Sequence, residues 1–149
     1  MSDIETNKAI VRRYFEMFNS GDLSQLAAIV SKDYGDKLEG QSSGIQVIRN
    51  YLEGLKASFP DFTWTIEQII GEGDRVAVMN RVSGTHMNDF GNIKATGNRV
   101  SFAAFQFYRI ADGKLAEHWE VADFAKFQEQ LTAEPAAIAF KSFQNTLKS

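Results

Sequence analysis

The chain has 149 residues, a formal net charge of −3 and no cysteine. Its length suits one domain that buries a sizeable core without a disulfide or metal staple. The absence of cysteine excludes a thiolate nucleophile, and two histidines alone argue against a structural zinc site. The negative charge argues against a nucleic-acid partner. Without a leader-like N-terminus or an apolar run of ~20 residues, we expect a cytoplasmic protein with no membrane contact.

The N-terminal part of the sequence predicts three helices. Residues 6–22 place apolar side chains at the i, i+3, i+4, i+7 spacing of an amphipathic helix, and Gly21 supplies its stop. Residues 23–34 carry a second, shorter apolar stripe. Residues 45–59 predict a third helix, which ends there because Pro60 disfavours helical geometry in the residue before it.

After Pro60 the apolar period changes to the alternation typical of strands. Strands are expected at 62–74, 75–86 and 98–110 and within 109–124, with helices at 122–131 and, finally, 136–148. This order predicts a single α+β domain over residues 1–149.

A tight hairpin is expected at Asp112-Gly113, between the last two strands. With a two-residue loop, Glu120 shares a face with Phe105. With a three-residue loop, Gln106 faces His118, and Glu120 lies on that same face. The two alternatives place the carboxylate on opposite faces of the sheet.

The second register gives the sheet two faces that are both rich in apolar residues, so we expect both to be covered. One would hold helices and a cavity, and the other could bind a second subunit in a homodimer or belong to an ordinary core. Glu120 can equally be a solvated strand residue and His118 a hydrogen-bonded structural one. The two faces carry Phe102, Gln106, His118 and Glu120 on one side, and Phe105, Phe107, Trp119 and Val121 on the other.

A family resemblance rests on five segments taken together: FPDFTWTIEQIIGEGDRVAV, SGTH, ATGNRVSF, YRIADGKLAEHWEVADF and QL. Over residues 7–131 this order resembles the SnoaL-like polyketide cyclases, which have the cone fold of ketosteroid-isomerase-like and nuclear-transport-factor-two-like proteins. The resemblance implies a strongly curved antiparallel sheet wrapped around the N-terminal helices and an apolar pocket, usually in a dimer.

The resemblance also implies chemistry: ring closure of a polyketide by intramolecular aldol addition, without metal or cofactor. A carboxylate in an apolar pocket suits this reaction, because desolvation raises its pKa toward the range of a general acid/base. The family's catalytic acidic residue falls on Glu120, and its companion histidine falls on Gln106. An amide donates a hydrogen bond but cannot titrate. His118 is therefore hypothesised to supply the imidazole from the neighbouring strand.

Further ligand contacts are expected from the helices and the sheet. Asn80 shares strand parity with three valines, so it is either a satisfied structural residue or an anchor for a substrate carbonyl or Glu120. The expected partner is a small apolar or aromatic ligand that contains a carbonyl. The predicted lining residues are Tyr14, Phe18, Tyr34, Tyr51, Phe59 and Phe102.

Two rival functions stay open beside a cofactor-independent lyase or isomerase. One is a non-catalytic binding module on the same cone, an interpretation favoured because position 106 carries Gln instead of the family's histidine. The other is a hydrolase that opens epoxides, in which an acidic residue activates water. A polar network of aspartates with an arginine would favour hydrolysis, but Arg81 has the opposite parity to Asn80.

Overall fold

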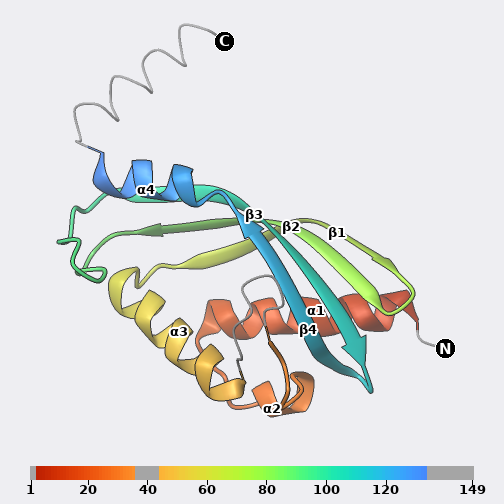
Figure 1. Cartoon of the computed structure of the whole chain (residues 1–149). Helices are drawn as coiled ribbons and strands as arrows, with labels where there is room; N and C mark the ends of the chain where they lie inside the picture. The colour runs from red at the N-terminus through yellow and green to blue at the C-terminus, as the bar shows by residue number, and fades with distance from the viewer. Residues whose placement is uncertain (1–2, 36–43, 134–149) are drawn as a thin grey trace, which may run out of the picture.

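The structure is a computed structural model that describes residues 3–35 and 44–133. Four antiparallel strands form one sheet in the order β1-β2-β3-β4. Figure 1 shows this sheet as a curved layer with α1, α2 and α3 on its concave side and α4 at one end. The expected curved α+β cone is thus confirmed, whereas the predicted helix at 136–148 lies outside the described residues. The elements are α1 (Ile4–Ser20), α2 (Leu26–Ile29), α3 (Ile45–Ser58), β1 (Thr63–Glu72), β2 (Arg75–Thr85), β3 (Arg99–Ala111), β4 (Lys114–Ala122) and α4 (Phe124–Thr132).

The two long helices begin and end where local chemistry dictates. The side chain of Asp3 accepts a hydrogen bond from the backbone N–H of Thr6 at 2.9 Å, which caps the start of α1. Gly21 ends α1 in the left-handed conformation, with φ 78°. Helix α3 stops at Ser58, before Pro60, as predicted.

The second predicted helix is mostly wrong, because only its middle turn forms α2. Val30 is extended and forms a parallel bridge with Leu115 of β4, and the N–H of Ser31 donates to the Leu115 carbonyl at 2.9 Å. Pairing with a strand therefore outcompetes the helical pattern after Ile29. This connection ties the segment that carries Tyr34 to β4.

The β3–β4 hairpin contains both a two-residue turn and a bulge. Asp112 and Gly113 have φ 51° and φ 73°, as a type I′ turn requires. Ala116 is then left unpaired, because Ile110 pairs with Leu115 but the preceding Arg109 pairs with Glu117.

This bulge corrects both predicted registers. Glu120 does not share a face with Phe105, because the extra residue reverses the parity of the two-residue loop. Gln106 pairs with Glu120 rather than with His118, as the three-residue loop would require. The face predicted by that second register is nevertheless right: Gln106, His118 and Glu120 share the concave side of the sheet.

The core lies between the concave face and the helices. Val11, Phe15 and Phe18 of α1 pack there with Val76 and Val78 of β2. Burial of these apolar side chains is the main force that holds α1 in the curve of the sheet. Within the described ranges, no helix is long and apolar enough to cross a membrane.

Candidate active site

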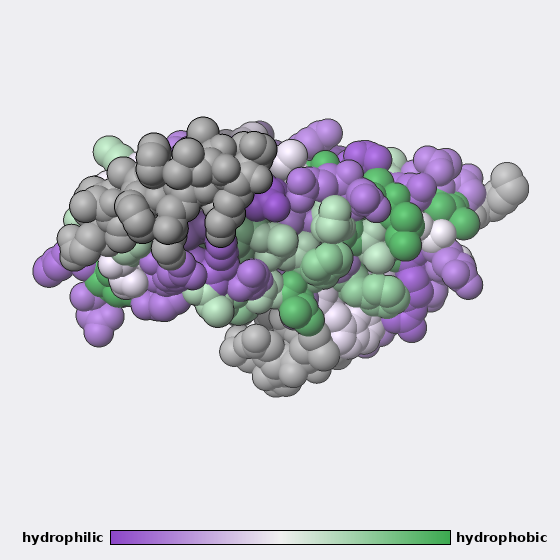
Figure 2. All heavy atoms as spheres, turned by 90° about the horizontal axis from the view of Figure 1, so that it is seen from above, coloured by the Kyte–Doolittle hydropathy of each residue, from purple (hydrophilic) through white to green (hydrophobic). Residues whose placement is uncertain are grey.

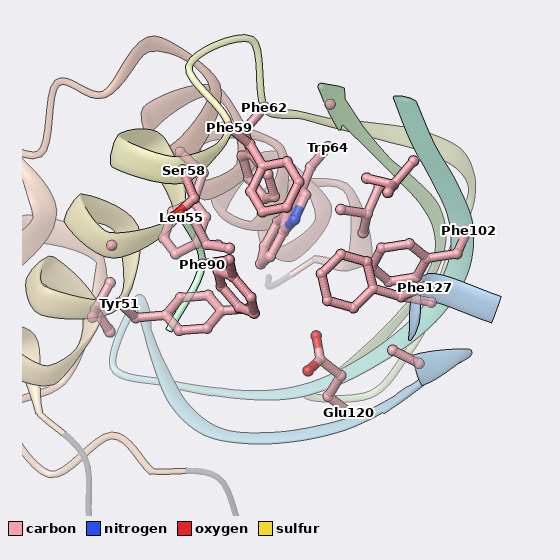
Figure 3. Close-up of a pocket in the computed structure, with 18 of the residues that line it drawn as sticks. Tyr51, Leu55, Ser58, Phe59, Phe62, Trp64, Phe90, Phe102, Glu120 and Phe127 are labelled. Atoms are coloured by element: carbon pink, nitrogen blue, oxygen red, sulfur yellow. The ribbon is translucent and has the colours of Figure 1, made fainter. Parts of the chain in front are cut away.

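A cavity of about 760 Å³ opens between the concave face of the sheet and helices α1, α3 and α4. This size is typical of small-molecule sites. Its wall is largely aromatic, and Glu120 is the single carboxylate among its described lining residues, which include no Lys or Arg. Figure 3 shows the Glu120 side chain pointing into this space from β4.

The predicted lining residues all lie on the cavity wall, namely Tyr14, Phe18, Tyr34, Tyr51, Phe59 and Phe102. Their contacts with a ligand stay a prediction. Sequence reasoning missed Trp64 and Phe90, as well as Phe124 and Phe127 of α4. The strand alternation that buries Trp64 was visible in the sequence. The contribution of α4 was not, because it depends on how that helix packs against β3.

Three predicted catalytic residues are joined by hydrogen bonds on the concave face. Nε2 of Gln106 donates to Oε2 of Glu120 at 2.6 Å, and Oε1 of Gln106 lies 2.5 Å from Nε2 of His118. The Gln106 side chain is buried at 1% exposure. His118 and Glu120 line the cavity, whereas Gln106 lies behind them as the link.

The hydrogen-bond roles in this chain follow from the chemistry of the groups. An ionised carboxylate only accepts, so the Gln106 amide nitrogen must face Glu120 and its oxygen must face His118. His118 then carries a proton on Nε2 and donates it to that oxygen. An amide therefore fixes the direction of the carboxylate and places a proton on Nε2 of the imidazole.

The His118 ring is held between two tyrosines. The ring of Tyr108 stacks on it at 4.9 Å between centroids and the ring of Tyr34 at 5.8 Å. The His118 backbone N–H also donates to the carbonyl of Gly35 at 3.0 Å. The strand-like pairing after α2 thus brings Tyr34 over the imidazole, so the orientation of His118 is fixed by backbone and rings together.

The negative charge of Glu120 contributes to a raised pKa at all four tyrosines of the chain. Burial, reinforced by that charge, raises the pKa of Tyr14, Tyr34 and Tyr108 well above the ordinary value. The rings of Tyr14 and Tyr34 lie side by side, 6.4 Å apart between centroids. These phenols consequently remain protonated donors at neutral pH.

Asn80 does not line the cavity. It is fully buried on β2, where neither atom of its amide has a hydrogen-bond partner within the described chain. Ala104, which pairs with Asn80 on β3, does form part of the cavity wall. Asn80 thus sits beside the floor of the cavity, and its role as a substrate anchor stays a prediction.

His86 has a structural setting. It is fully buried, its ring stacks on Phe59 at 5.4 Å, and Nδ1 lies 3.0 Å from the hydroxyl oxygen of Thr96. These contacts fasten the loop that follows β2. Within residues 3–35 and 44–133, no three His, Cys, Asp or Glu side chains are grouped to hold a metal ion.

Comparison with known proteins agrees with this geometry. The SnoaL-like polyketide cyclase family matches residues 8–131. Aklanonic acid methyl ester cyclase DnrD from Streptomyces peucetius is 26% identical over 139 residues, which cover 86% of this chain and 92% of that protein. TsrD from Streptomyces laurentii has a TM-score of 0.80 at 23% identity, covering 90% of this chain and 100% of its own. IdmH from Streptomyces antibioticus has a TM-score of 0.75 at 28% identity, with coverages of 85% and 99%.

The curved sheet, the enclosed helix and the aromatic cavity define a cone-shaped α+β protein with a cavity sized for a small molecule. Within that class, the family match covers most of the chain. The protein belongs to the SnoaL-like polyketide cyclase family.

Proposed function

We propose that this protein is a cofactor-independent cyclase that closes a ring in an uncharged, carbonyl-rich substrate by intramolecular aldol addition. The observation that carries the proposal is the single carboxylate among the described lining residues, Glu120, which enters an aromatic cavity while a buried amide orients it. Gln106 and His118 would act as positioning residues, and Tyr14 with Tyr34 as hydrogen-bond donors.

The composition of the cavity wall supports an uncharged substrate. No Lys or Arg stands among its described lining residues to balance a ligand carboxylate or phosphate, and Glu120 would repel either. Flat aromatic side chains favour planar apolar ligands. The relative from Streptomyces peucetius is named for a methyl ester, in which the acid is masked, and this agrees with such a substrate.

In the proposed reaction, one proton moves from the substrate carbon to Glu120 and then from Glu120 to the product oxygen. The Glu120 carboxylate removes a proton from a carbon flanked by carbonyls, and the electron pair of that C–H bond forms an enolate. The enolate carbon attacks a ketone of the same molecule, so that a C–C bond forms and an alkoxide develops. The protonated Glu120 then gives its proton to the alkoxide, which regenerates the carboxylate.

The surrounding groups would assist without titrating. The Gln106 amide donates to Glu120 and so stabilises its charged form in a cavity that water leaves when the ligand enters. Tyr14 and Tyr34, which both line the cavity, offer a phenol to the enolate or alkoxide oxygen, because the raised pKa of both keeps them protonated. The walls would hold a flexible chain in a folded, reactive conformation.

The test is exchange of solvent deuterium into activated C–H positions of a panel of β-keto esters and small cyclic ketones. Wild-type protein is expected to catalyse exchange, and Glu120→Gln is expected to lose it. If neither protein exchanges any ligand that is shown to bind, a binding module replaces the proposal. Incorporation of ¹⁸O from labelled water into a product would replace it with hydrolysis.

We also propose that the outer face of the sheet pairs with a second copy of the chain. Large apolar side chains stand exposed there, including Ile70 at 65%, Phe105 at 56% and Val121 at 63%. Figure 2 shows hydrophobic side chains gathered on the face seen from above, with hydrophilic ones around them. A monomer rarely leaves such a patch to water, and a two-fold dimer would cover both copies at once.

A further inference from the structure

The wall of the cavity that faces Glu120 contains a second polar group, the indole of Trp64 on β1. Figure 3 shows the Glu120 carboxylate and the Trp64 ring entering the cavity from opposite sides. The described wall around Trp64 is mostly apolar, with Phe18, Phe62 and Phe102 among its members. An N–H group in such surroundings is the natural partner for an oxygen acceptor on a ligand.

Trp64 is held rigidly. The Asn19 side chain at the end of α1 makes two hydrogen bonds to its backbone: Nδ2 donates to the Trp64 carbonyl at 2.8 Å, and Oδ1 accepts from the Trp64 N–H at 2.7 Å. The ring packs on Phe18 at 4.5 Å and on Phe15 at 5.0 Å between centroids. Backbone and ring are therefore fixed before a ligand arrives, which reduces the entropy lost on binding.

The indole N–H is available from the cavity. Within residues 3–35 and 44–133 no group accepts a hydrogen bond from Nε1. Among the described residues, the fully buried side-chain polar atoms without a partner belong to Asn80, His86 and Tyr108. Nε1 of Trp64 is not one of them, so this atom is accessible to a small probe. By contrast, the hydroxyl of Ser58, another lining residue, is already used, because it donates to the carbonyl of Asp89 at 2.7 Å.

We infer that the Trp64 indole is a second ligand anchor, which selects substrates with an oxygen acceptor on the side of the ligand remote from the reacting carbon. The inference rests on the proposed function, because it assigns the far end of the same site. Its ligand class is a planar, uncharged molecule with a ketone, quinone or ester oxygen at that end. Indole is a donor only, so it would discriminate against analogues that carry hydrogen there or a group that can only donate.

The probes that test this inference are 9-fluorenone and fluorene, which share a flat, uncharged shape but differ in one carbonyl oxygen. Their dissociation constants are to be measured on wild type, Trp64→Phe and the matched control Trp119→Phe, whose indole lies on the outer face of the sheet. Loss of ring volume in Trp64→Phe affects both probes, so the ratio of the two constants isolates the N–H group. We expect the ratio of the fluorene dissociation constant to the fluorenone dissociation constant to be about fivefold larger in wild type and Trp119→Phe than in Trp64→Phe.

A second measurement is independent of any loss of packing. In the Trp119→Phe variant, the single indole N–H resonance in a ¹H–¹⁵N spectrum belongs to Trp64. Fluorenone is expected to move this resonance downfield, as a new hydrogen bond does, and fluorene is not. Three results would each overturn the role of Trp64 as an anchor. They are an unchanged ratio of dissociation constants in Trp64→Phe, the same resonance shift with both probes, and binding of neither probe. The proposed function is decided separately, by deuterium exchange in Glu120→Gln, so the two ideas can fail independently.

Discussion

The two faces of the sheet are built from alternate residues of the same strands, yet they carry different chemistry. On the concave side, Gln106, His118 and Glu120 form a hydrogen-bonded chain at the edge of an aromatic cavity. On the outer side, Phe107 and Trp119 pair edge to face at 5.7 Å. The strands β3 and β4 thus supply both a polar group whose burial costs free energy and an apolar surface whose exposure to water costs free energy. The comparison teaches that strand parity, set by one bulge, decides whether a residue of β4 lies on the cavity side or on the outer face of the sheet.

The largest expected effect comes from removing the concave carboxylate. Glu120→Gln keeps the shape of the side chain but removes the base, so turnover should fall about 10²- to 10⁴-fold. The affinity for an uncharged ligand should change little, because the cavity wall is intact. Enzyme kinetics and calorimetric titration measure the two quantities. A fall in affinity that matches the fall in turnover would mean that Glu120 binds the ligand rather than reacting with it.

The second largest effect is expected on the outer face. Phe105→Glu puts a charge into the middle of the proposed dimer contact, and the dimer dissociation constant should rise about a hundredfold because that charge would be buried without a partner. Analytical ultracentrifugation over a range of concentrations measures it. Lys94→Glu, an exposed change in the loop between β2 and β3, is the control. A wild-type chain that is monomeric at every concentration would contradict the pairing of these faces.

Loss of the linking amide should have an intermediate effect. Gln106→Leu leaves Glu120 and the His118 N–H without their shared partner, so the exchange rate should fall about tenfold through misplacement of the carboxylate. The free energy of unfolding should fall by about 1–3 kcal/mol. Exchange kinetics and urea unfolding measure these changes. Gln106→His, which restores an N–H donor, should recover part of the rate. Equal rates in Gln106→Leu and wild type would remove the positioning role.

The smallest effect concerns the buried phenols of the concave side. Burial raises the pKa of Tyr14, Tyr34 and Tyr108, so their contribution to stability is complete below pH 10, the ordinary tyrosine value, and is lost as pH rises above it. Tyr108→Phe should make this alkaline loss shallower, because one ionisable group is gone. It should also stabilise the fold by about 1 kcal/mol at neutral pH, since the Tyr108 hydroxyl has no partner in the described chain. Thermal unfolding from pH 7 to pH 11 measures both effects. A steeper alkaline loss in Tyr108→Phe would contradict this account.

Much of this architecture could be predicted from sequence, because local chemistry decides it. Gly21 and Pro60 end helices through their own backbone preferences, and Asp112-Gly113 makes its turn for the same reason. The bulge at Ala116 could not be predicted, since it depends on how β4 meets the segment around Val30 as well as β3. Because neither predicted register included this extra unpaired residue, neither predicted pairing of Glu120 was right, although one of them placed it on the correct face.

The candidate site shows the same limit. The aromatic residues of α1 and β3 were expected at the cavity because their spacing assigns them to an inward face. Two contributions depend on tertiary packing, for which the sequence has no local signal. One is the aromatic end formed by α4, and the other is the stacking of Tyr34 on His118, which requires the helical pattern after Ile29 to give way to strand pairing.

The most direct test of the central claim compares two carboxylates of one strand. The initial rate of solvent deuterium incorporation into a β-keto ester is to be measured for Glu120→Gln and for Glu117→Gln, whose side chain belongs to the other face and pairs with Arg109. The account predicts that exchange collapses in Glu120→Gln and continues at close to the wild-type rate in Glu117→Gln. Equal rates in the two variants would contradict it, because the concave carboxylate would then have no part in the chemistry.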